Sequence, residues 1–141
     1  MIYMEKYSSA ICEIKYHIIW CPKYRKEFLV GEVKEYLENI LNTICETRNW
    51  KIIEKEIMPD HIHIFISAPP YDSPTNIIRI LKGVSARQMY KRFSKLASHF
   101  RKGHLWSPSY YIGTAGNMSA ETIQQYIQNQ TKGGSRNSST A

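Results

Sequence analysis

The 141-residue chain carries a formal net charge of +7, and 43% of its residues are hydrophobic. This length fits one domain with one core, and no apolar run is long enough to span a bilayer, so we expect no transmembrane helix. The three cysteines form no CxxC pair, so they offer no thiolate metal site and fit a reducing compartment. We therefore expect a cytoplasmic protein.

The hydrophobic pattern predicts the secondary structure along the chain. In order, it predicts a strand over 12–20, a helix over 31–48, strands over 50–58 and 61–68, a helix from Ser73-Pro74 onward, a strand over 109–114 and a short helix over 119–130. Ser73 is a favourable N-cap and Pro74 suits the first helical position. We expect that helix to break or kink near Gly83, with its buried side continuing to Phe93 and Leu96.

The order β-α-β-β-α-β-α predicts an α+β fold. It is typical of a ferredoxin-like, RRM-like sandwich, in which a four-stranded antiparallel sheet has helices on one face. The additional C-terminal helix follows the last strand and could dock across the sheet or reach a neighbouring subunit. We expect one domain over residues 1–130 and a small, polar tail over 131–141 that is disordered.

The positive charge is concentrated in one contiguous third of the chain. Residues 73–120 contain no Asp or Glu, so all 12 acidic residues lie elsewhere. The basic residues of this stretch are Arg79, Lys82, Arg87, Lys91, Arg92, Lys95, Arg101 and Lys102. Clustered positive charge is typical of a polyphosphate partner, although a solvated helix face has the same pattern. The stretch is not one long basic amphipathic helix, so nucleic acid is favoured over a membrane surface.

Two histidines alternate on one predicted strand. Residues i and i+2 of a strand point to the same side, about 7 Å apart, so His61 and His63 share a face. Their imidazoles can ligate one cation if the strand twist brings them together. Taken alone, the pair is equally consistent with two partly exposed histidines of a sheet.

A tyrosine and a glutamine share one face of the last predicted helix. Tyr126 and Gln130 are four residues apart, a spacing that brings side chains within about 5–6 Å. A glutamine oxygen can bind a hard cation, and the tyrosine hydroxyl would then lie beside the same ion. On its own, the pattern also fits a surface helix with a packing tyrosine.

Together, these residue types suit phosphodiester transfer. That reaction needs an in-line nucleophile and a cation that neutralises charge on the phosphate oxygens. Tyrosine, with a pKa of about 10, is a poor nucleophile until it is held in place, but it is a fair leaving group in the reverse reaction. A phosphotyrosine link therefore conserves bond energy, and the strand is resealed without ATP. Two neutral imidazoles and an amide suit Mg²⁺ or Mn²⁺.

Four segments of the chain resemble a known family. The segments are HIIWCPKYR at 17–25, MPDHIHIFI at 58–66, LKGVSAR at 81–87 and LWSPSYYIGTAGNMSAETIQQYIQNQ at 105–130. In this order and spacing they resemble the single-tyrosine HUH transposases of small prokaryotic insertion sequences, which transpose as single-stranded DNA. HUH denotes histidine, bulky apolar residue, histidine, which residues 61–63 satisfy.

The resemblance implies a mechanism and partners. It implies that His61, His63 and Gln130 bind a divalent metal, and that Tyr126 attacks the DNA to leave a 5′-phosphotyrosine and a free 3′-OH. It implies single-stranded DNA hairpins at the element ends as substrate. It also implies a homodimer in which the helix of Tyr126 completes the partner's site, with the glycine-containing link before that helix as a flexible arm.

Other residues have predicted roles around this centre. We expect DNA phosphates to contact a set of basic residues, namely Arg79, Lys82, Arg87, Lys91 and Arg92. Trp106, Tyr110 and Tyr111 could stack on unpaired bases or pack in the core. His17 is expected to have a structural role beside the site.

Two alternative functions stay open from the sequence. A domesticated HUH nuclease that acts on repeated palindromes would carry the same catalytic residues. A non-catalytic single-stranded nucleic-acid-binding module on the same sheet would explain the basic stretch and the aromatic residues. It would leave the conjunction of His61, His63, Tyr126 and Gln130 as coincidence.

Overall fold

The computed structural model describes residues 5–7, 10–100, 104–114 and 120–130. Its strands are β1 (Glu5–Tyr7), β2 (Ala10–Cys12), β3 (Ile14–Trp20), β4 (Lys51–Met58), β5 (His61–Ala68) and β6 (Tyr111–Thr114). Its helices are the short 3₁₀ turn η1 (Lys23–Arg25), α1 (Gly31–Arg48), α2 (Pro74–Arg92), α3 (Leu96–His99) and α4 (Ala120–Gln128). The expected tail over 131–141 lies outside the described residues.

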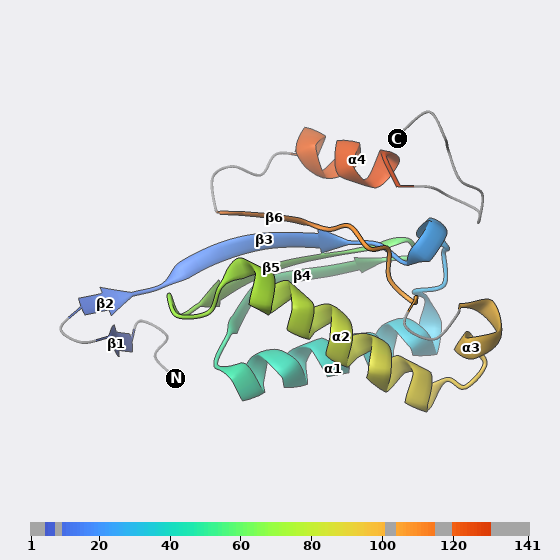
Figure 1. Ribbon diagram of the computed structural model, residues 1–141, viewed down its shortest axis with the longest axis horizontal. Helices are drawn as coiled ribbons and strands as arrows, with labels where there is room; N and C mark the ends of the chain where they lie inside the picture. The colour runs from blue at the N-terminus through green and yellow to red at the C-terminus, as the bar shows by residue number, and fades with distance from the viewer. Residues whose placement is uncertain (1–4, 8–9, 101–103, 115–119, 131–141) are drawn as a thin grey trace.

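Four strands form an antiparallel sheet in the order β4-β5-β3-β6. The helices α1 and α2 connect β3 to β4 and β5 to β6 and lie together on one face of this sheet (Figure 1). The strand order and the placement of the two helices are those of the ferredoxin-like sandwich, so the predicted fold is confirmed. None of the described helices is long and apolar enough to cross a membrane.

The two faces of the sheet have different coverings. Ile62, Ile64 and Ile66 of β5 are completely buried against the helices α1 and α2, as the alternation of the strand predicts. The helix α4 lies on the opposite face, above β6 and β3 (Figure 1). Ile19 of β3 is also fully buried but lies outside the main core cluster. The chain thus has a second, smaller buried layer between the sheet and α4.

The helix α2 differs from its prediction at the glycine. It is continuous from Pro74 to Arg92, so the expected break near Gly83 is wrong. A glycine inside a helix costs about 1 kcal/mol, which the burial of neighbours such as Leu81 and Ser85 outweighs. The predicted N-cap is confirmed, because the Ser73 Oγ accepts a hydrogen bond from the Asn76 backbone N at 3.1 Å.

Other boundaries also differ from the pattern. The predicted strand over 12–20 is interrupted at Glu13, and its first residue belongs to a separate hairpin of β1 and β2. Leu96 is buried as expected but lies in the separate helix α3. The last strand begins at Tyr111 rather than at 109, because residues 105–109 form a segment with other partners.

Trp106 connects this segment to the core. Its side chain is 7% exposed, and its ring meets the ring of Trp20 edge-on with centroids 6.0 Å apart. Its indole N–H donates to the Lys82 carbonyl oxygen at 3.1 Å and to the Ser85 Oγ at 3.0 Å. The base-stacking option for Trp106 is therefore wrong, and core packing is the correct interpretation.

Replacing Trp106 with phenylalanine is expected to lower the free energy of unfolding by about 1–3 kcal/mol. The change leaves the Ser85 hydroxyl without its indole partner in a fully buried position. Denaturant titration measures the loss. The double variant Trp106→Phe/Ser85→Ala should be destabilised by less than the sum of the single variants, because each single variant already loses the same indole–hydroxyl hydrogen bond. Strict additivity would contradict the assignment.

Candidate functional site

The predicted metal-binding histidines lie on the face of the sheet that α4 covers. His61 and His63 alternate on β5 with the buried isoleucines, so both rings point away from the main core, and both are half-buried. On the neighbouring strand β3, His17 pairs with Phe65, and Ile19 pairs with His63. His17 and His63 are therefore diagonal neighbours on one face, a spacing that long side chains bridge.

His17 contacts His63 directly. The His17 Nδ1 lies 3.0 Å from the His63 Nε2, within hydrogen-bonding distance. The His17 ring also stacks on Phe65, with centroids 4.0 Å apart and planes 8° from parallel. Burial lowers the pKa of both His17 and His63 below the ordinary value for histidine. The charges of His17 and His61 lower the pKa of His63 further, while Glu54 and Glu56 act in the opposite direction. Both imidazoles are thereby favoured in the neutral form that a metal ion requires.

His61 has a different partner. Its Nδ1 lies 2.9 Å from the Oδ1 of Asp60, in the turn that joins β4 to β5. A carboxylate only accepts hydrogen bonds, so the hydrogen belongs to Nδ1 and the lone pair of the ring to Nε2. A carboxylate that fixes a histidine tautomer in this way is a common support of metal-ligating histidines.

Tyr126 and Gln130 meet two serines at the end of α4. The hydroxyl of Tyr126 lies 3.3 Å from the Ser109 Oγ. The Gln130 Oε1 accepts hydrogen bonds from the Ser107 Oγ at 3.0 Å and from the Ser109 Oγ at 2.9 Å. The Gln130 Nε2 donates to the backbone oxygen of Tyr126 at 3.2 Å. The four-residue spacing therefore places the two side chains together, as predicted.

The serine-bearing segment 105–109 is held by several independent contacts. The backbone N of Lys23 donates to the Leu105 oxygen, and the backbone N of Ser107 donates to the Cys21 oxygen, both at 2.8 Å. The Lys82 Nζ donates to the backbone oxygen of Ser107 at 2.7 Å. With Trp106 in the core, these bonds make the segment a firm support for the tyrosine and the glutamine.

Burial raises the pKa of the Tyr126 phenol above its ordinary value. The hydrogen bond between Tyr126 and Ser109 acts in the opposite direction, and the nearby Cys21 raises the pKa further. The thiol of Cys21 is itself buried, with its pKa raised to about 12 by burial and by Asp60. Tyr126 is therefore protonated at neutral pH, and it needs help to lose its proton before it can act as a nucleophile.

In the described contacts, the four predicted centre residues fall into two pairs. His61 and His63 lie together on β5, while Tyr126 and Gln130 meet on the serine segment. Within the described part of the chain, no group of three or more His, Cys, Asp or Glu side chains is arranged to hold a metal. The histidine pair does supply two imidazoles, a donor type that suits a divalent cation, and the lone pair of His61 lies on its Nε2.

Arg25 joins the two pairs. Its Nη1 donates to the backbone oxygen of Ile127 in α4 at 2.8 Å, and its Nε lies 3.1 Å from the Oδ2 of Asp60. Sequence reasoning missed Arg25, Asp60, Ser107 and Ser109. The motif segments contain all four, but none has a periodicity or spacing that distinguishes it from a surface polar residue.

The basic residues of the acid-free stretch lie mainly on α2. Arg79, Arg87, Lys91 and Arg92 are exposed, and Arg79 contacts the Asn76 side chain. Lys82 is instead half-buried and donates to the carbonyls of 107–109, and burial lowers the pKa of its ammonium. No observation tests DNA contact by these five residues, which stays a prediction.

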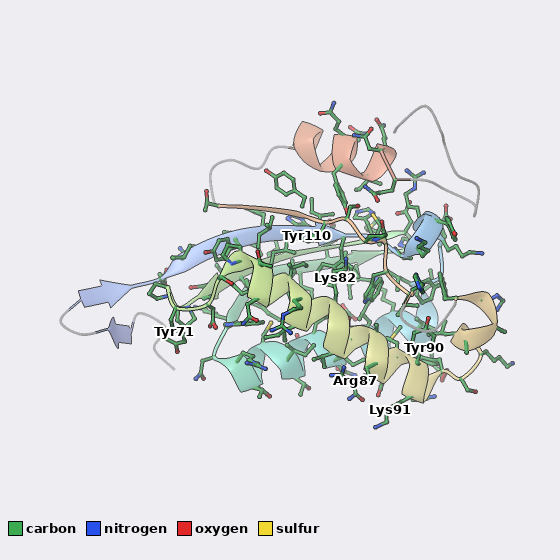
Figure 2. The ribbon with its side chains drawn as sticks, viewed as in Figure 1. Tyr71, Lys82, Arg87, Tyr90, Lys91 and Tyr110 are labelled. Atoms are coloured by element: carbon green, nitrogen blue, oxygen red, sulfur yellow. The ribbon has the colours of Figure 1, made fainter. Side chains whose placement is uncertain are left out.

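A groove of about 900 Å³ runs between α2 and residues 104–108. The residues that line it include Lys82, Arg87, Lys91 and His104, and none of its described lining residues is acidic. Arg87 and Lys91 follow each other along α2, and Lys82 lies earlier on the same helix, near Tyr110 (Figure 2). The Lys82 ammonium is 5.6 Å from the centre of the Tyr110 ring. Ser107 lies in the groove and also contacts Gln130, so the groove adjoins the tyrosine site.

Gly113 provides space for an aromatic side chain. It pairs with His17 across the strands, and a Cβ at this position would lie 2.8 Å from the hydroxyl oxygen of Tyr111. The glycine therefore admits the Tyr111 ring on the face that α4 covers. The flexible-arm role expected for this link has no support at Gly113, which is part of β6, and Gly116 lies outside the described residues.

Comparisons with known proteins show the family of the chain. The family model for IS200-like transposases matches residues 10–130. The ISDra2 transposase TnpA of Deinococcus radiodurans is 39% identical over 127 residues, which cover 90% of this chain and 91% of that protein. The transposase of insertion sequence IS200 from Salmonella typhimurium is 38% identical over 116 residues, with 82% of this chain and 76% of that protein covered.

Solved structures show the same fold. A crystal structure from Deinococcus radiodurans R1, assigned as a transposase, has a TM-score of 0.85 at 37% identity and covers 92% of this chain and 100% of that one. The REP-associated tyrosine transposase bound to a REP hairpin has a TM-score of 0.54 at 13% identity, with 90% and 70% covered, and shows the fold alone.

The sheet bears histidines on one face, and a helix that bears a tyrosine lies across that face. With this fold and these relatives, the chain is a transposase, a DNA-processing enzyme. Within that class, the chain belongs to the IS200-like transposase family of small insertion sequences.

Proposed function

We propose that this transposase cleaves and rejoins single-stranded DNA at the ends of its insertion sequence, with Tyr126 as the nucleophile. The observation that carries the proposal is the pairing of Tyr126 and Gln130 on Ser109, at the face of the sheet that also bears His61 and His63. His61, His63 and Gln130 are the proposed ligands of Mg²⁺ or Mn²⁺. The bound cation supplies positive charge beside the phosphate oxygens.

The strand transfer is a transesterification at phosphorus. The phenol oxygen of Tyr126 forms a bond to the phosphorus, and the bond from that phosphorus to the 3′-oxygen breaks. A 5′-phosphotyrosine and a free 3′-OH result, and the phenol proton ends on the departing oxygen. In the reverse direction, a 3′-OH attacks the phosphotyrosine and restores the phenol. Ser109, the hydrogen-bonding partner of the phenol, holds the oxygen in place and opposes the effect of burial on its pKa.

The DNA contacts are proposed for the surface beside this centre. The exposed Arg87 and Lys91 would bind phosphates along α2, and the groove between α2 and residues 104–108 would lead the strand past Ser107 toward Tyr126. Folded hairpins at the element ends are the proposed substrate, and a chain of the same fold is bound to a REP hairpin. The predicted homodimer belongs to the same proposal.

The decisive experiment asks whether the protein forms a covalent adduct with single-stranded DNA. The purified chain is incubated with Mg²⁺ or Mn²⁺ and a labelled oligonucleotide that carries the end of its own element, and the products are separated on denaturing gels. We expect an adduct with single-stranded hairpin DNA and at least about tenfold less with the matching duplex, since paired bases keep the strand from entering a single-strand groove.

The other outcomes would contradict the proposal in different ways. If hairpin DNA binds tightly but no adduct forms with either metal, the chain is a binding module rather than a nuclease. If duplex DNA reacts as well as single-stranded DNA, the proposed substrate is wrong. Adducts on unrelated palindromes, but not on the ends of the element, would support a domesticated nuclease.

A further inference from the structure

The side chain of Arg25 contacts two separate parts of the protein, Asp60 in the turn before β5 and the backbone of α4. The guanidinium bonds to the Ile127 oxygen across 102 residues of sequence, and it forms an ion pair with Asp60. The Arg25 side chain is 17% exposed, and those of Asp60 and His61 are 19% and 15% exposed. The three groups therefore interact in a mostly desolvated space, where charge is screened less than at a surface.

The backbone places Arg25 at this position at a conformational cost. Tyr24 and Arg25 have φ values of 61° and 53°, in the left-handed region that side chains rarely adopt. The surrounding structure fixes this turn, because Pro22 bridges to Trp106 and the Lys23 backbone N bonds to the Leu105 oxygen. Strained backbone of this kind persists where surrounding contacts over-determine it, and it occurs often at functional sites.

The two contacts of Arg25 are chemically different. The bond from Nη1 to the Ile127 oxygen is a true hydrogen bond, which requires the reach of the guanidinium. The Nε lies near the Asp60 Oδ2, but its N–H makes no hydrogen bond, so this contact is electrostatic. The other oxygen of Asp60 holds the His61 Nδ1. A displacement of α4 is thus transmitted to His61 through the side chains of Arg25 and Asp60. A change at Asp60 is transmitted to α4 through Arg25 alone.

We propose that Arg25 is a positioning residue that couples the docking of α4 to the orientation of His61. One side chain then sets both the helix that carries the nucleophile and a histidine of the metal pair. The proposal rests on the proposed function for its catalytic meaning, but the coupling itself is a property of the protein without DNA or metal. By reciprocity, each end of the coupled system must respond to a change at the other.

The test is amide hydrogen exchange of the full chain without DNA, combined with Mn²⁺ titration. In Arg25→Gln, we expect the amides of α4 to exchange about tenfold faster, since a hydrogen bond from a charged group is lost. We also expect Mn²⁺ to bind about tenfold more weakly, as for other residues that support metal ligands. Exposed Arg48, at the end of α1, provides the matched control, because Arg48→Gln removes the same charge and should change neither quantity.

Asp60→Asn gives the sharper result, because Asp60 makes no described contact with α4. Coupling requires that this variant also speeds exchange in α4, while the amides of β5 keep their protection. In Arg25→Lys, the charge near Asp60 remains but the reach to Ile127 is lost, so exchange in α4 should rise while Mn²⁺ affinity falls less than in Arg25→Gln.

Unchanged α4 exchange in Asp60→Asn would overturn the coupling, and so would unchanged exchange in Arg25→Lys. If Arg25→Gln speeds exchange across the whole sheet, Asp60→Asn and Arg25→Lys still decide whether α4 and His61 are coupled. If the native chain forms no adduct with DNA yet the exchange results are as expected, the proposed function fails and the coupling stands.

Discussion

Tyr126→Phe is expected to abolish the covalent adduct with single-stranded DNA and to lower strand cleavage by about 10³-fold or more, the scale on which enzymes lose activity with their nucleophile. The change removes one oxygen and leaves the ring that packs on the serine segment, so the fold should survive. The adduct is measured on denaturing gels, and the rate is taken from a single turnover with protein in excess. DNA binding measured at the same salt concentration should stay within about threefold of the native value, because the proposed phosphate contacts of Arg87 and Lys91 along α2 are unchanged.

The neighbouring hydroxyl makes this a demanding test. Ser109 lies 3.3 Å from the phenol and is another oxygen nucleophile in reach of the same position. An adduct that survives in Tyr126→Phe and maps by mass spectrometry to Ser109 would show that the nucleophile is misassigned. Tyr71→Phe is the matched control, since Tyr71 is 69% exposed in the loop before α2 and should retain full adduct formation.

Simultaneous replacement of His61 and His63 by alanine is expected to eliminate Mn²⁺ binding and adduct formation together. Two of the three proposed ligands are lost, and the remaining Gln130 amide is too weak a donor to hold the ion alone. Chelation of the metal with EDTA should stop the native enzyme to the same extent, and added Mn²⁺ should restore only the native enzyme. Isothermal titration measures the affinity, and the gel assay measures the adduct.

His99→Ala is the control for the double variant. It shows whether the loss of Mn²⁺ binding is specific to His61 and His63 or follows from the removal of any histidine. His99 is exposed at the end of α3 and is not a proposed ligand, so its loss should leave the Mn²⁺ affinity unchanged. If the double variant still binds Mn²⁺ with native affinity, the histidine pair is not the metal site. If it binds no metal but still forms adducts, the cation is not required for the chemistry.

The sequence predicted the sandwich well because its elements have strong local patterns. The alternation through Ile62, Ile64 and Ile66 and the helical spacing over 31–48 each report a single buried face, and the order of such elements restricts the possible topologies. The pattern was wrong at Gly83, where tertiary burial outweighed local propensity. It also missed the hairpin of β1 and β2, which is too short to have a clear period.

The candidate site was only partly accessible from the sequence. The i to i+2 and i to i+4 spacings correctly put His61 beside His63 and Tyr126 beside Gln130. The residues that support these pairs come from distant segments: Arg25 reaches Ile127, and Ser109 receives the Tyr126 side chain. No local period records such long-range contacts. The burial of Trp106 was equally invisible, because an aromatic residue in a basic stretch has the same pattern whether it stacks on a base or fills a core.

The location of α4 has a consequence for how the protein is made. The sandwich is complete in sequence once β6 has been synthesised, whereas the seat of Tyr126 requires residues up to Gln130 to fold back onto the turn of Arg25. Contacts of such long sequence separation form late in folding, and a nascent chain folds from its N-terminus as it emerges. A growing polypeptide therefore forms α2, the helix proposed to bind DNA, well before Tyr126, the proposed nucleophile, can take its place. The proposed catalytic site is therefore complete only after residues up to Gln130 have been synthesised.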